Sequence, residues 1–250
     1  MPKIIAVAGK GGVGKTTLCG MLVRYLVEEA KDGAVLAVDA DSNSNLNELL
    51  DVEVTGTIGD ARELMKKDVP VGMTKDVWFE LKVHEAIIEG NGFDLLVMGR
   101  PEGPGCYCAA NSLAKESIDQ LKKNYAYVVV DNEAGMEHIS RLVTQDIDQL
   151  FVVSDATPRS VLTAKRIVEL VKELNLNVGK VGIIINRLKD EKSAGLIDMA
   201  VGNGAELAGT IRIDAVLAED DIEGKSIFSL DKASVALVDA YQIFSRSLKG

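Results

Sequence analysis

The stretch "GKGGVGKTT", Gly9 to Thr17, decides the fold of this 250-residue chain. It satisfies the pattern G-x-x-x-x-G-K-[ST] through Gly9, Gly14, Lys15 and Thr16. The apolar run "KIIAVA" (residues 3–8) comes directly before it, and a helical pattern begins at its end. A strand, a glycine-rich turn and a helix in this order form the context in which the pattern binds phosphate. The sequence therefore predicts a phosphate-binding loop between the first strand and the first helix.

The chemistry of this loop indicates a nucleoside triphosphate with a bound magnesium ion. Glycines let backbone N–H groups curl around phosphate oxygens, and the helix N-terminus adds the positive end of its dipole. Lys15 is expected to neutralise the β- and γ-phosphates, and the hydroxyl of Thr16 is expected to ligate Mg²⁺. We therefore expect ATP and Mg²⁺ as cofactors, with the nucleotide held by Gly11, Gly12, Val13, Gly14, Lys15, Thr16 and Thr17.

Short apolar runs alternate with helical patterns along nearly the whole chain. The runs are apolar throughout, as strands buried on both faces should be, and lie at residues 3–8, 34–39, 93–99, 127–131, 150–155, 181–186 and, as a further candidate, 206–214. Helical stretches lie between them at 15–30, 158–174 and 233–247. This alternation predicts an α/β fold of the P-loop NTPase type, a doubly wound, mostly parallel sheet flanked by helices on both faces. Residues 1–250 are expected to form a single domain with a helical excursion at about 43–92.

The composition and charge of the chain argue against nucleic-acid and membrane partners. The chain is 47% hydrophobic and 26% charged, with a formal net charge of −10 and no basic tail, which argues against a nucleic-acid partner. Its first residues read as a strand and not as a signal peptide. No segment approaches about 18 uninterrupted apolar residues, so no membrane partner is expected. These features predict a cytoplasmic protein, in which thiols stay reduced.

Two acidic segments end predicted strands, at the edge where open α/β sheets bind ligands. The second strand ends "VDAD", with Asp39 and Asp41, and a later strand ends "VVVDNEAGMEH", with Asp131. Asp131 is a candidate for holding Mg²⁺ through water, with Asp39 in support. Because "DSNSN" is rich in capping residues, helix capping by Asp39 and Asp41 is an open alternative. The same later segment contains Gly135, whose N–H is expected near the γ-phosphate, and three residues of open role, Glu133, Glu137 and His138.

A pair of cysteines, Cys106 and Cys108, lies in the loop-like stretch "GPGCYCAAN" (residues 103–111). In an extended backbone, residues i and i+2 point to the same side, so both sulfurs can reach one metal ion. Two thiolates leave a tetrahedral or square-planar ion half-coordinated, and a twofold dimer would supply the other two. Cys19 is expected to be a buried apolar residue instead. The open alternatives for the pair are free thiols, a redox pair and ligands of an iron–sulfur cluster.

The form "GKGGVGKT" resembles the deviant Walker A motif of the MinD/Mrp/ParA class of ATPases, which includes the nitrogenase iron protein. The resemblance implies that Lys10 reaches the partner's nucleotide in an ATP-promoted homodimer, with a solvated loop lysine as the alternative. It also implies that Asp41 positions the attacking water and that Asn186 recognises adenine through its amide. Lys10, Lys15 and Asp41 are then the expected catalytic residues. Arg212, in "TIRID", departs from the proline that the class often shows there, so base contacts on that side stay open.

Four segments, in this order, resemble the nickel-insertion ATPases of the CooC/AcsF type: "GKGGVGKTT", "VDADSNSNLNELL", "GCYCAAN" and "DNEAGMEH". The resemblance runs through nearly the whole chain, and the Cys-x-Cys pair is its most discriminating part. It implies an ATP-dependent metallochaperone that holds Ni²⁺, with Zn²⁺ as a substitute, between the thiolates of a dimer. It also implies a client that receives the nickel, CO dehydrogenase or acetyl-CoA synthase. An iron–sulfur carrier ATPase and a positioning ATPase of the MinD or ParA kind are the alternatives.

Overall fold

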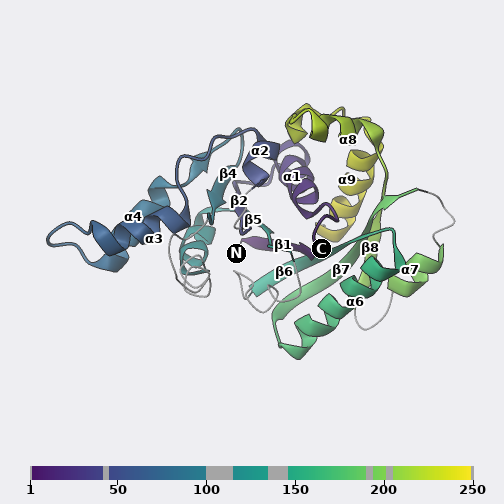
Figure 1. Cartoon of the computed structure of the whole chain (residues 1–250), viewed down its shortest axis with the longest axis horizontal. Coiled ribbons are helices and arrows are strands. Elements are labelled where there is room, and N and C mark those ends of the chain that lie inside the picture. The colour runs from purple at the N-terminus through teal and green to yellow at the C-terminus, as the bar shows by residue number, and fades with distance from the viewer. Residues whose placement is uncertain are drawn as a thin grey trace.

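The strands form one sheet through the middle of the molecule (Figure 1). The computed structural model describes residues 2–41, 45–99, 115–134, 146–189, 194–200 and 205–248. Within these ranges the sheet has eight strands in the order β3-β4-β2-β5-β1-β6-β7-β8, and only the pair of β3 and β4 is antiparallel. The strands are β1 Lys3–Gly9, β2 Val35–Asp39, β3 Ile88–Glu89, β4 Asp94–Val97, β5 Tyr127–Asp131, β6 Asp146–Asp155, β7 Asn177–Leu188 and β8 Glu206–Arg212.

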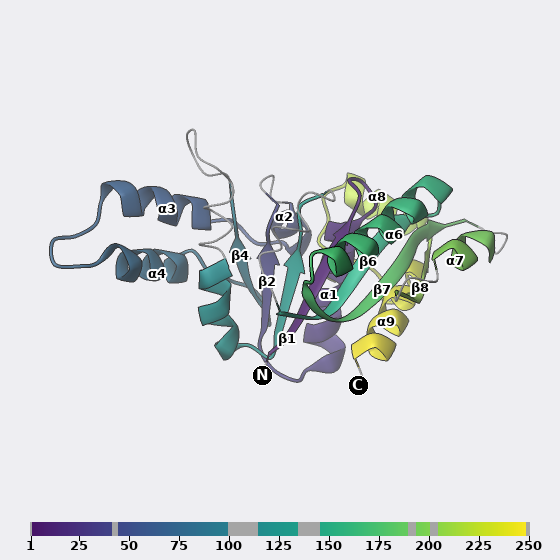
Figure 2. The same ribbon diagram turned by 90° about the horizontal axis from the view of Figure 1, so that it is seen from below.

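Helices cover both faces of the sheet (Figure 1 and Figure 2). On one face, α1 (Lys15–Tyr25) and α9 (Val235–Leu248) pack against residues such as Val7 of β1. On the other face, α3 (Ile58–Lys67) and α6 (Pro158–Glu173) pack against residues such as Ala6. Successive side chains of a strand point to opposite faces, and both faces are covered, which is why these strands are apolar throughout. The predicted doubly wound α/β fold is confirmed.

Further helical segments complete the described chain. They are the π-helix η1 Leu26–Ala30, which continues α1, then α2 Leu46–Leu50, α4 Lys75–Glu85, residues 115–121, the 3₁₀ turn η2 Lys122–Asn124, α7 Ala194–Ala200, α8 Ala215–Ile222 and the 3₁₀ turn η5 Ile227–Ser229. The prediction of helices near 15–30, 158–174 and 233–247 is confirmed by α1 with η1, by α6 and by α9.

The C-terminal helix α9 packs into the core. Its inward face consists of buried residues, Ala236, Leu237, Ala240, Ile243 and Phe244. The ring of Phe244 lies 5.7 Å from that of Tyr25 and 5.9 Å from that of Phe151. Its apolar stripe is therefore covered by protein, as the pattern predicts. Across the described residues, no helix is both long and apolar enough to span a lipid bilayer.

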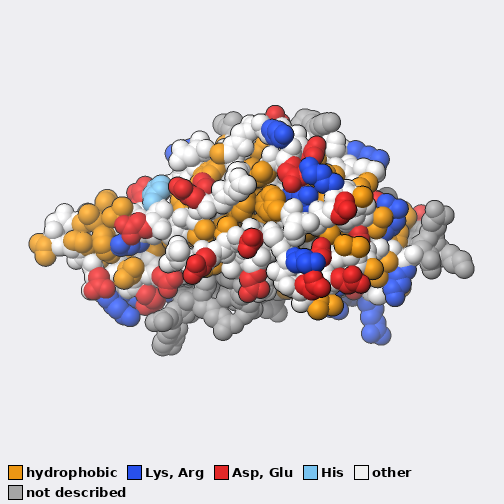
Figure 3. Space-filling view, turned by 90° about the horizontal axis from the view of Figure 1, so that it is seen from above, with side chains coloured by type: hydrophobic (Ala, Val, Ile, Leu, Met, Phe, Trp, Pro, Cys, Tyr) orange, Lys and Arg blue, Asp and Glu red, His pale blue; other side chains and the backbone are white. Residues whose placement is uncertain are grey.

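The segment 43–92 contains α2, α3, α4 and β3, and its α3–α4 hairpin projects from one end of the sheet (Figure 1 and Figure 2). Thr57 begins α3 with a capping box, in which Thr57 and Asp60 exchange hydrogen bonds. Apolar side chains gather on the surface of this hairpin (Figure 3), namely the exposed Leu64, Val71, Met73, Val77 and Leu81. Within the described part of this segment, only the α3–α4 hairpin extends beyond the sheet, because β3 pairs with β4 inside it and α2 packs against the core. The single-domain organisation of residues 1–250 stays a prediction.

Arg24 ties α1 to the chain segment that leads into α9. It is only 2% exposed, and its Nη1 donates hydrogen bonds of 2.7 Å to the carbonyls of Ile227 and Leu230. Its Nε also donates to Glu28 at 3.1 Å. Arg24→Ala would leave two buried carbonyls without a donor, so we expect it to lower the free energy of unfolding by about 3 kcal/mol or more. Urea denaturation measures this, and the exposed Arg166→Ala on α6 is the matched control; a loss below about 1 kcal/mol would contradict the prediction.

Candidate nucleotide and magnesium site

The phosphate loop joins the carboxyl end of β1 to α1, at the edge of the sheet where β2 and β5 also end. Gly9 has a φ of 155°, and a Cβ there would lie 2.5 Å from the carbonyl oxygen of Val153 in β6. Gly14 has a φ of 92°, and a Cβ there would lie 2.6 Å from Nδ2 of Asn186. Backbone conformation therefore favours glycine at both positions, and at Gly9 the backbone of β6 also leaves no room for a side chain.

The amino end of α1 forms an anion site. Gly14 is the N-cap, no side chain caps the helix, and its first turn contains no acidic residue. Lys15 opens the helix and is only 8% exposed. Uncapped N–H groups, the positive end of the helix dipole and a buried ammonium group together favour a phosphate at this point. Lys10, by contrast, is exposed to solvent.

Asp131 ends β5 directly beside this anion site. Its carboxylate accepts hydrogen bonds from the side chains of Thr16 and Cys19, and it is 2% exposed. Burial raises its pKa to about 7, and the nearby charge of Asp39 acts in the same direction. The hydroxyl of Thr16, the charge of Lys15 and the thiol of Cys19 oppose that shift. Because burial disfavours the ionised form of this carboxylate, a positive charge placed beside it would stabilise that form.

The residues present fit a magnesium ion. The Oδ1 atom of Asp131 is buried and has no hydrogen-bond partner among the described residues. The hydroxyl of Thr16 reaches the same carboxylate, so the two side chains supply oxygen ligands of the kind that Mg²⁺ prefers. Asp131 and Thr16 would hold a divalent cation that neutralises the buried charge, and such an ion would supply charge stabilisation for phosphoryl transfer.

Asp39 ends β2 and is directly opposite Asp131 in the ladder of β2 and β5. Its Oδ1 accepts a hydrogen bond from the N–H of Asp41 at 3.1 Å, and its Oδ2 accepts from the N–H groups of Asn45 and Leu46 at 3.0 Å each. Burial raises its pKa, and these three backbone donors act against that shift. Asp39 therefore holds the turn into α2, which favours the capping alternative for this residue. Its support of the metal and the water-positioning role of Asp41 stay predictions.

A cavity of about 330 Å³ opens beside the start of α1 and is lined by Gly14, Thr17 and Asn186, together with residues of α8. The amide of Asn186 faces the loop, because its Nδ2 donates to the carbonyl of Val13 at 2.9 Å. Arg212 also lines this cavity, and its guanidinium is held by Asp239 through hydrogen bonds of 2.8 and 2.7 Å. The cavity thus adjoins the phosphate loop, and adenine recognition by Asn186 stays a prediction.

Comparison with known proteins identifies the family. Residues 4–227 match the family model for the CobQ/CobB/MinD/ParA nucleotide-binding domain. The chain belongs to this family. It is an ATPase that binds ATP and Mg²⁺ through a P-loop, in agreement with the prediction from the sequence.

Relatives of this CobQ/CobB/MinD/ParA-family chain include proteins from archaea and bacteria. An uncharacterised ATP-binding protein of Methanocaldococcus jannaschii is 43% identical over 232 residues, which are 91% of this chain and 91% of that protein. The carbon monoxide dehydrogenase accessory protein CooC of Rhodospirillum rubrum is 30% identical over 243 residues, 92% of this chain and 90% of CooC. The MinD cell division protein of Aquifex aeolicus shares the fold with a TM-score of 0.72 at 23% identity, over 99% of this chain and 97% of that one.

The structure brings only part of the predicted site of this family member together. The loop residues, Asp39, Asp41, Asp131 and Asn186 lie along one edge of the sheet. Outside the described residues lie Cys106, Cys108, Gly135, Glu137 and His138. Among the residues that the structure does describe, no group of three or more His, Cys, Asp and Glu side chains is placed to hold a metal ion.

Two contacts in the site have no counterpart in the prediction from sequence. The thiol of Cys19 reaches Asp131 from α1, although burial, the predicted property of Cys19, is confirmed. Arg187 reaches back to the phosphate loop from the end of β7. In the sequence, the only signal for Arg187 is the dipeptide "NR" at the end of an apolar strand, and it does not indicate which backbone the arginine meets.

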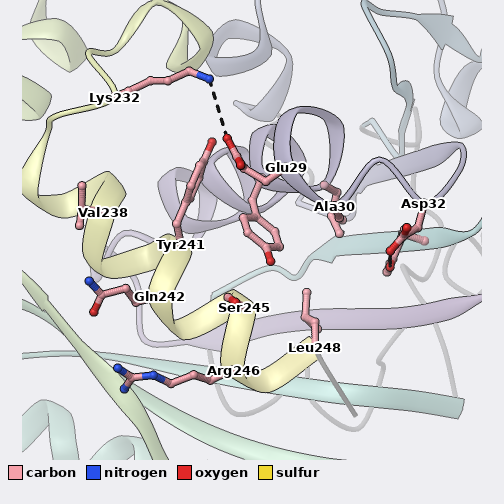
Figure 4. A pocket seen from close by; sticks show the side chains of 13 residues that line it. Glu29, Ala30, Asp32, Lys232, Val238, Tyr241, Gln242, Ser245, Arg246 and Leu248 are labelled. Atoms are coloured by element: carbon pink, nitrogen blue, oxygen red, sulfur yellow. Dashed lines mark hydrogen bonds and ion pairs between the residues drawn. The ribbon is translucent and has the colours of Figure 1, made fainter.

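A larger cavity, of about 690 Å³, lies between the end of α1 and α9 (Figure 4). Its lining includes Tyr127 at the first residue of β5 and Asp32 just before β2, so it lies at the amino ends of the strands. Lys232 points across it toward Glu29, with the two charged groups 3.8 Å apart. The phosphate loop is at the opposite edge of the sheet, and the ATPase chemistry does not extend to this cavity.

Proposed function

We propose that this ATPase is a metallochaperone that carries Ni²⁺ and inserts it into CO dehydrogenase or acetyl-CoA synthase. The observation that carries the proposal is the likeness to the CO dehydrogenase accessory protein CooC over 92% of this chain. The Cys106-x-Cys108 pair supplies two thiolates, ligands that suit Ni²⁺ and Zn²⁺ alike. A homodimer would bring together two such pairs and thus four sulfurs.

In this proposal the residues at the sheet edge have divided roles. Lys15 and the loop N–H groups hold the phosphates, Thr16 and Asp131 hold Mg²⁺, and Asp41 orients the attacking water. Lys10, which is exposed to solvent, reaches the nucleotide of the second protomer. ATP binding then favours the dimer in which the thiolates hold nickel, and hydrolysis releases it. Such coupling requires that nucleotide and metal each favour the same dimer state.

The fold offers a connection between the nucleotide and the cysteine segment. β4 is the strand that precedes that segment, and its last residue, Val97, is directly opposite Asp39 of β2. The N–H of Met98 donates to the carbonyl of Asp39 at 2.9 Å. A shift of the turn after β2 on hydrolysis therefore acts on the backbone that leads toward Cys106.

The test is metal content and molecular mass with and without ATP. Anaerobic protein is mixed with Ni²⁺ and either ATP or a non-hydrolysable analogue, and then analysed by gel filtration with light scattering and by elemental analysis. We expect a dimer with one nickel per two chains only when nucleotide is present. Lys10→Ala should still bind ATP but remain monomeric and free of nickel, because it lacks the cation that bridges the protomers. One nickel on each monomer, or a mass of Lys10→Ala that rises with ATP as in the wild type, would count against the proposal.

The same material distinguishes the alternatives. An iron–sulfur carrier would turn brown with broad absorbance after anaerobic reconstitution with iron and sulfide. A positioning ATPase would bind vesicles or DNA in response to ATP without any need for metal. The apolar face of α9 is buried in the core, which does not favour membrane binding, and the net charge of −10 does not favour DNA binding.

A further inference from the structure

Two successive residues at the end of β7 hold the phosphate loop from outside. The Nδ2 of Asn186 donates to the carbonyl of Val13, and the Nη1 of Arg187 donates to the carbonyl of Gly12, each at 2.9 Å. Both carbonyls belong to the loop that receives the nucleotide phosphates. The Arg187 contact joins residues 175 positions apart in the chain, so it exists only because β7 and the loop meet in the fold.

The backbone at Arg187 has an uncommon conformation. Arg187 has a φ of 58°, in the left-handed region that side chains other than glycine rarely adopt. The Oδ1 of Asn186 accepts from the N–H of Arg187 at 2.9 Å, and the ladder with β8 changes register between Ile185 and Leu188. A residue other than glycine holds such a conformation where surrounding contacts stabilise it, and here the hydrogen bonds of Asn186 and Arg187 do so.

The direction of the two carbonyls determines the direction of two N–H groups. In a trans peptide, the carbonyl of one residue and the N–H of the next point in opposite directions. Holding the Gly12 carbonyl toward β7 turns the N–H of Val13 away from β7, and holding the Val13 carbonyl does the same for the N–H of Gly14. Gly12 itself is exposed, with a φ of 79°, and a Cβ there would meet no other described group within 4 Å.

We propose that Arg187 is a positioning residue of the ATPase: its guanidinium presets the phosphate loop by holding the Gly12 carbonyl, so that the Val13 N–H is ready to bind phosphate. It acts through the loop and not on the reacting atoms. Preorganisation of this kind strengthens the binding of the di- and triphosphate alike, because the entropy of ordering the loop is removed before the nucleotide arrives. The proposal rests on the ATPase activity alone and is independent of nickel.

The test compares Arg187→Ala, Arg187→Gly and Arg187→Lys. Steady-state ATP hydrolysis gives kcat and KM, titration calorimetry with Mg·ADP gives the dissociation constant, and thermal unfolding gives Tm. We expect Ala and Gly to raise KM and the ADP dissociation constant equally, by about tenfold, with kcat within about twofold of wild type. Arg187→Lys retains one donor and should recover part of the affinity. Arg166→Ala, on the exposed side of α6, should match wild type in all of these.

Stability separates this role from a merely structural one. Glycine accepts a positive φ without strain, so Arg187→Gly should melt higher than Arg187→Ala, although both lose nucleotide affinity to the same extent. An affinity that followed Tm across the two variants would overturn the proposal. So would an unchanged KM in both, or a loss confined to kcat.

Discussion

Asp131→Asn is expected to lower Mg²⁺-dependent ATP hydrolysis at least about a hundredfold, and at the same time to stabilise the protein without nucleotide. The loss of activity follows from the proposed role of Asp131, because asparagine supplies no negative charge to hold Mg²⁺ against the phosphates. The gain in stability follows from the structure, because Oδ1 of Asp131 is buried and without a partner among the described residues. A neutral amide of the same shape removes an unneutralised buried charge.

The pH dependence of unfolding checks the second half of this prediction. The folded pKa of Asp131, about 7, lies above its ordinary value of 3.8, so the folded state binds the proton more tightly than the unfolded chain does. Stability from this group is therefore full below about pH 4, and falls as the pH rises toward about 7, by at most about 4 kcal/mol. In EDTA, wild-type protein should lose stability over this range and Asp131→Asn should lose less. Asp198→Asn, exposed on α7, is the matched control.

Two outcomes would contradict this account of Asp131. One is hydrolysis by Asp131→Asn within about tenfold of wild type at saturating Mg²⁺, which would remove the carboxylate from the metal site. The other is a variant that is less stable than wild type at pH 8 in EDTA, which would mean that the buried carboxylate is neutralised by some other group. With Mg²⁺ and ATP present, the order should reverse, because ligands stabilise only the protein that binds them.

Cys106→Ser and Cys108→Ser should each abolish stoichiometric nickel binding and leave nucleotide binding unchanged. A serine hydroxyl stays protonated at neutral pH and is a poor ligand for Ni²⁺, and in a symmetric dimer one substitution removes two of four ligands. The readouts are nickel per chain after gel filtration and the calorimetric dissociation constant for Mg·ADP. Cys19→Ser is the matched control and should retain nickel, because Cys19 is buried against Asp131.

The outcome of the cysteine test bears on the metal site and not on the ATPase. Tight binding of one Ni²⁺ or Zn²⁺ per dimer by either serine variant would reject the thiolate bridge. Loss of both metal and nucleotide binding would instead indicate a folding defect, which the Tm of each variant would reveal. Retention of an iron–sulfur chromophore by wild type alone would favour the cluster carrier.

Much of the fold is predictable from the chain because its strands are buried on both faces. A short run that is apolar at nearly every position, such as "YVVVD", predicts a strand covered by helices on both faces, and β5 spans Tyr127–Asp131 as expected. The ends of strands that lie outside the core are harder to predict from the sequence. β6 and β7 extend to Asp146 and Asn177, where, among the described residues, the two strands pair only with each other. The side chain of Asn177 donates a hydrogen bond to Asp146 at 2.8 Å. The short antiparallel β3 has no apolar pattern to reveal it.

The candidate site also has parts that the sequence predicts and parts that it does not. The loop and Asp131 are readable because each motif is contiguous and its spacing reflects local geometry. Arg187 and Cys19 act across the fold, and nothing in their own neighbourhoods in the sequence indicates which backbone or carboxylate they meet. For Asp39 the sequence misleads in the opposite way. Its position at a strand end suggests that it binds a metal ion, but its oxygens already accept hydrogen bonds from three backbone N–H groups.

Because Cys19 is buried, alkylation of thiols in the folded protein can measure whether Cys106 and Cys108 are occupied by a metal ion. The chain has three cysteines, and Cys19 is fully buried, with a pKa raised by burial, so it is a poor nucleophile in the folded protein. Alkylation of native protein therefore reports on Cys106 and Cys108, and alkylation after denaturation counts all three. Protection of Cys106 and Cys108 from alkylation by a metal, by ATP or by both together can be read from the mass of the intact chain.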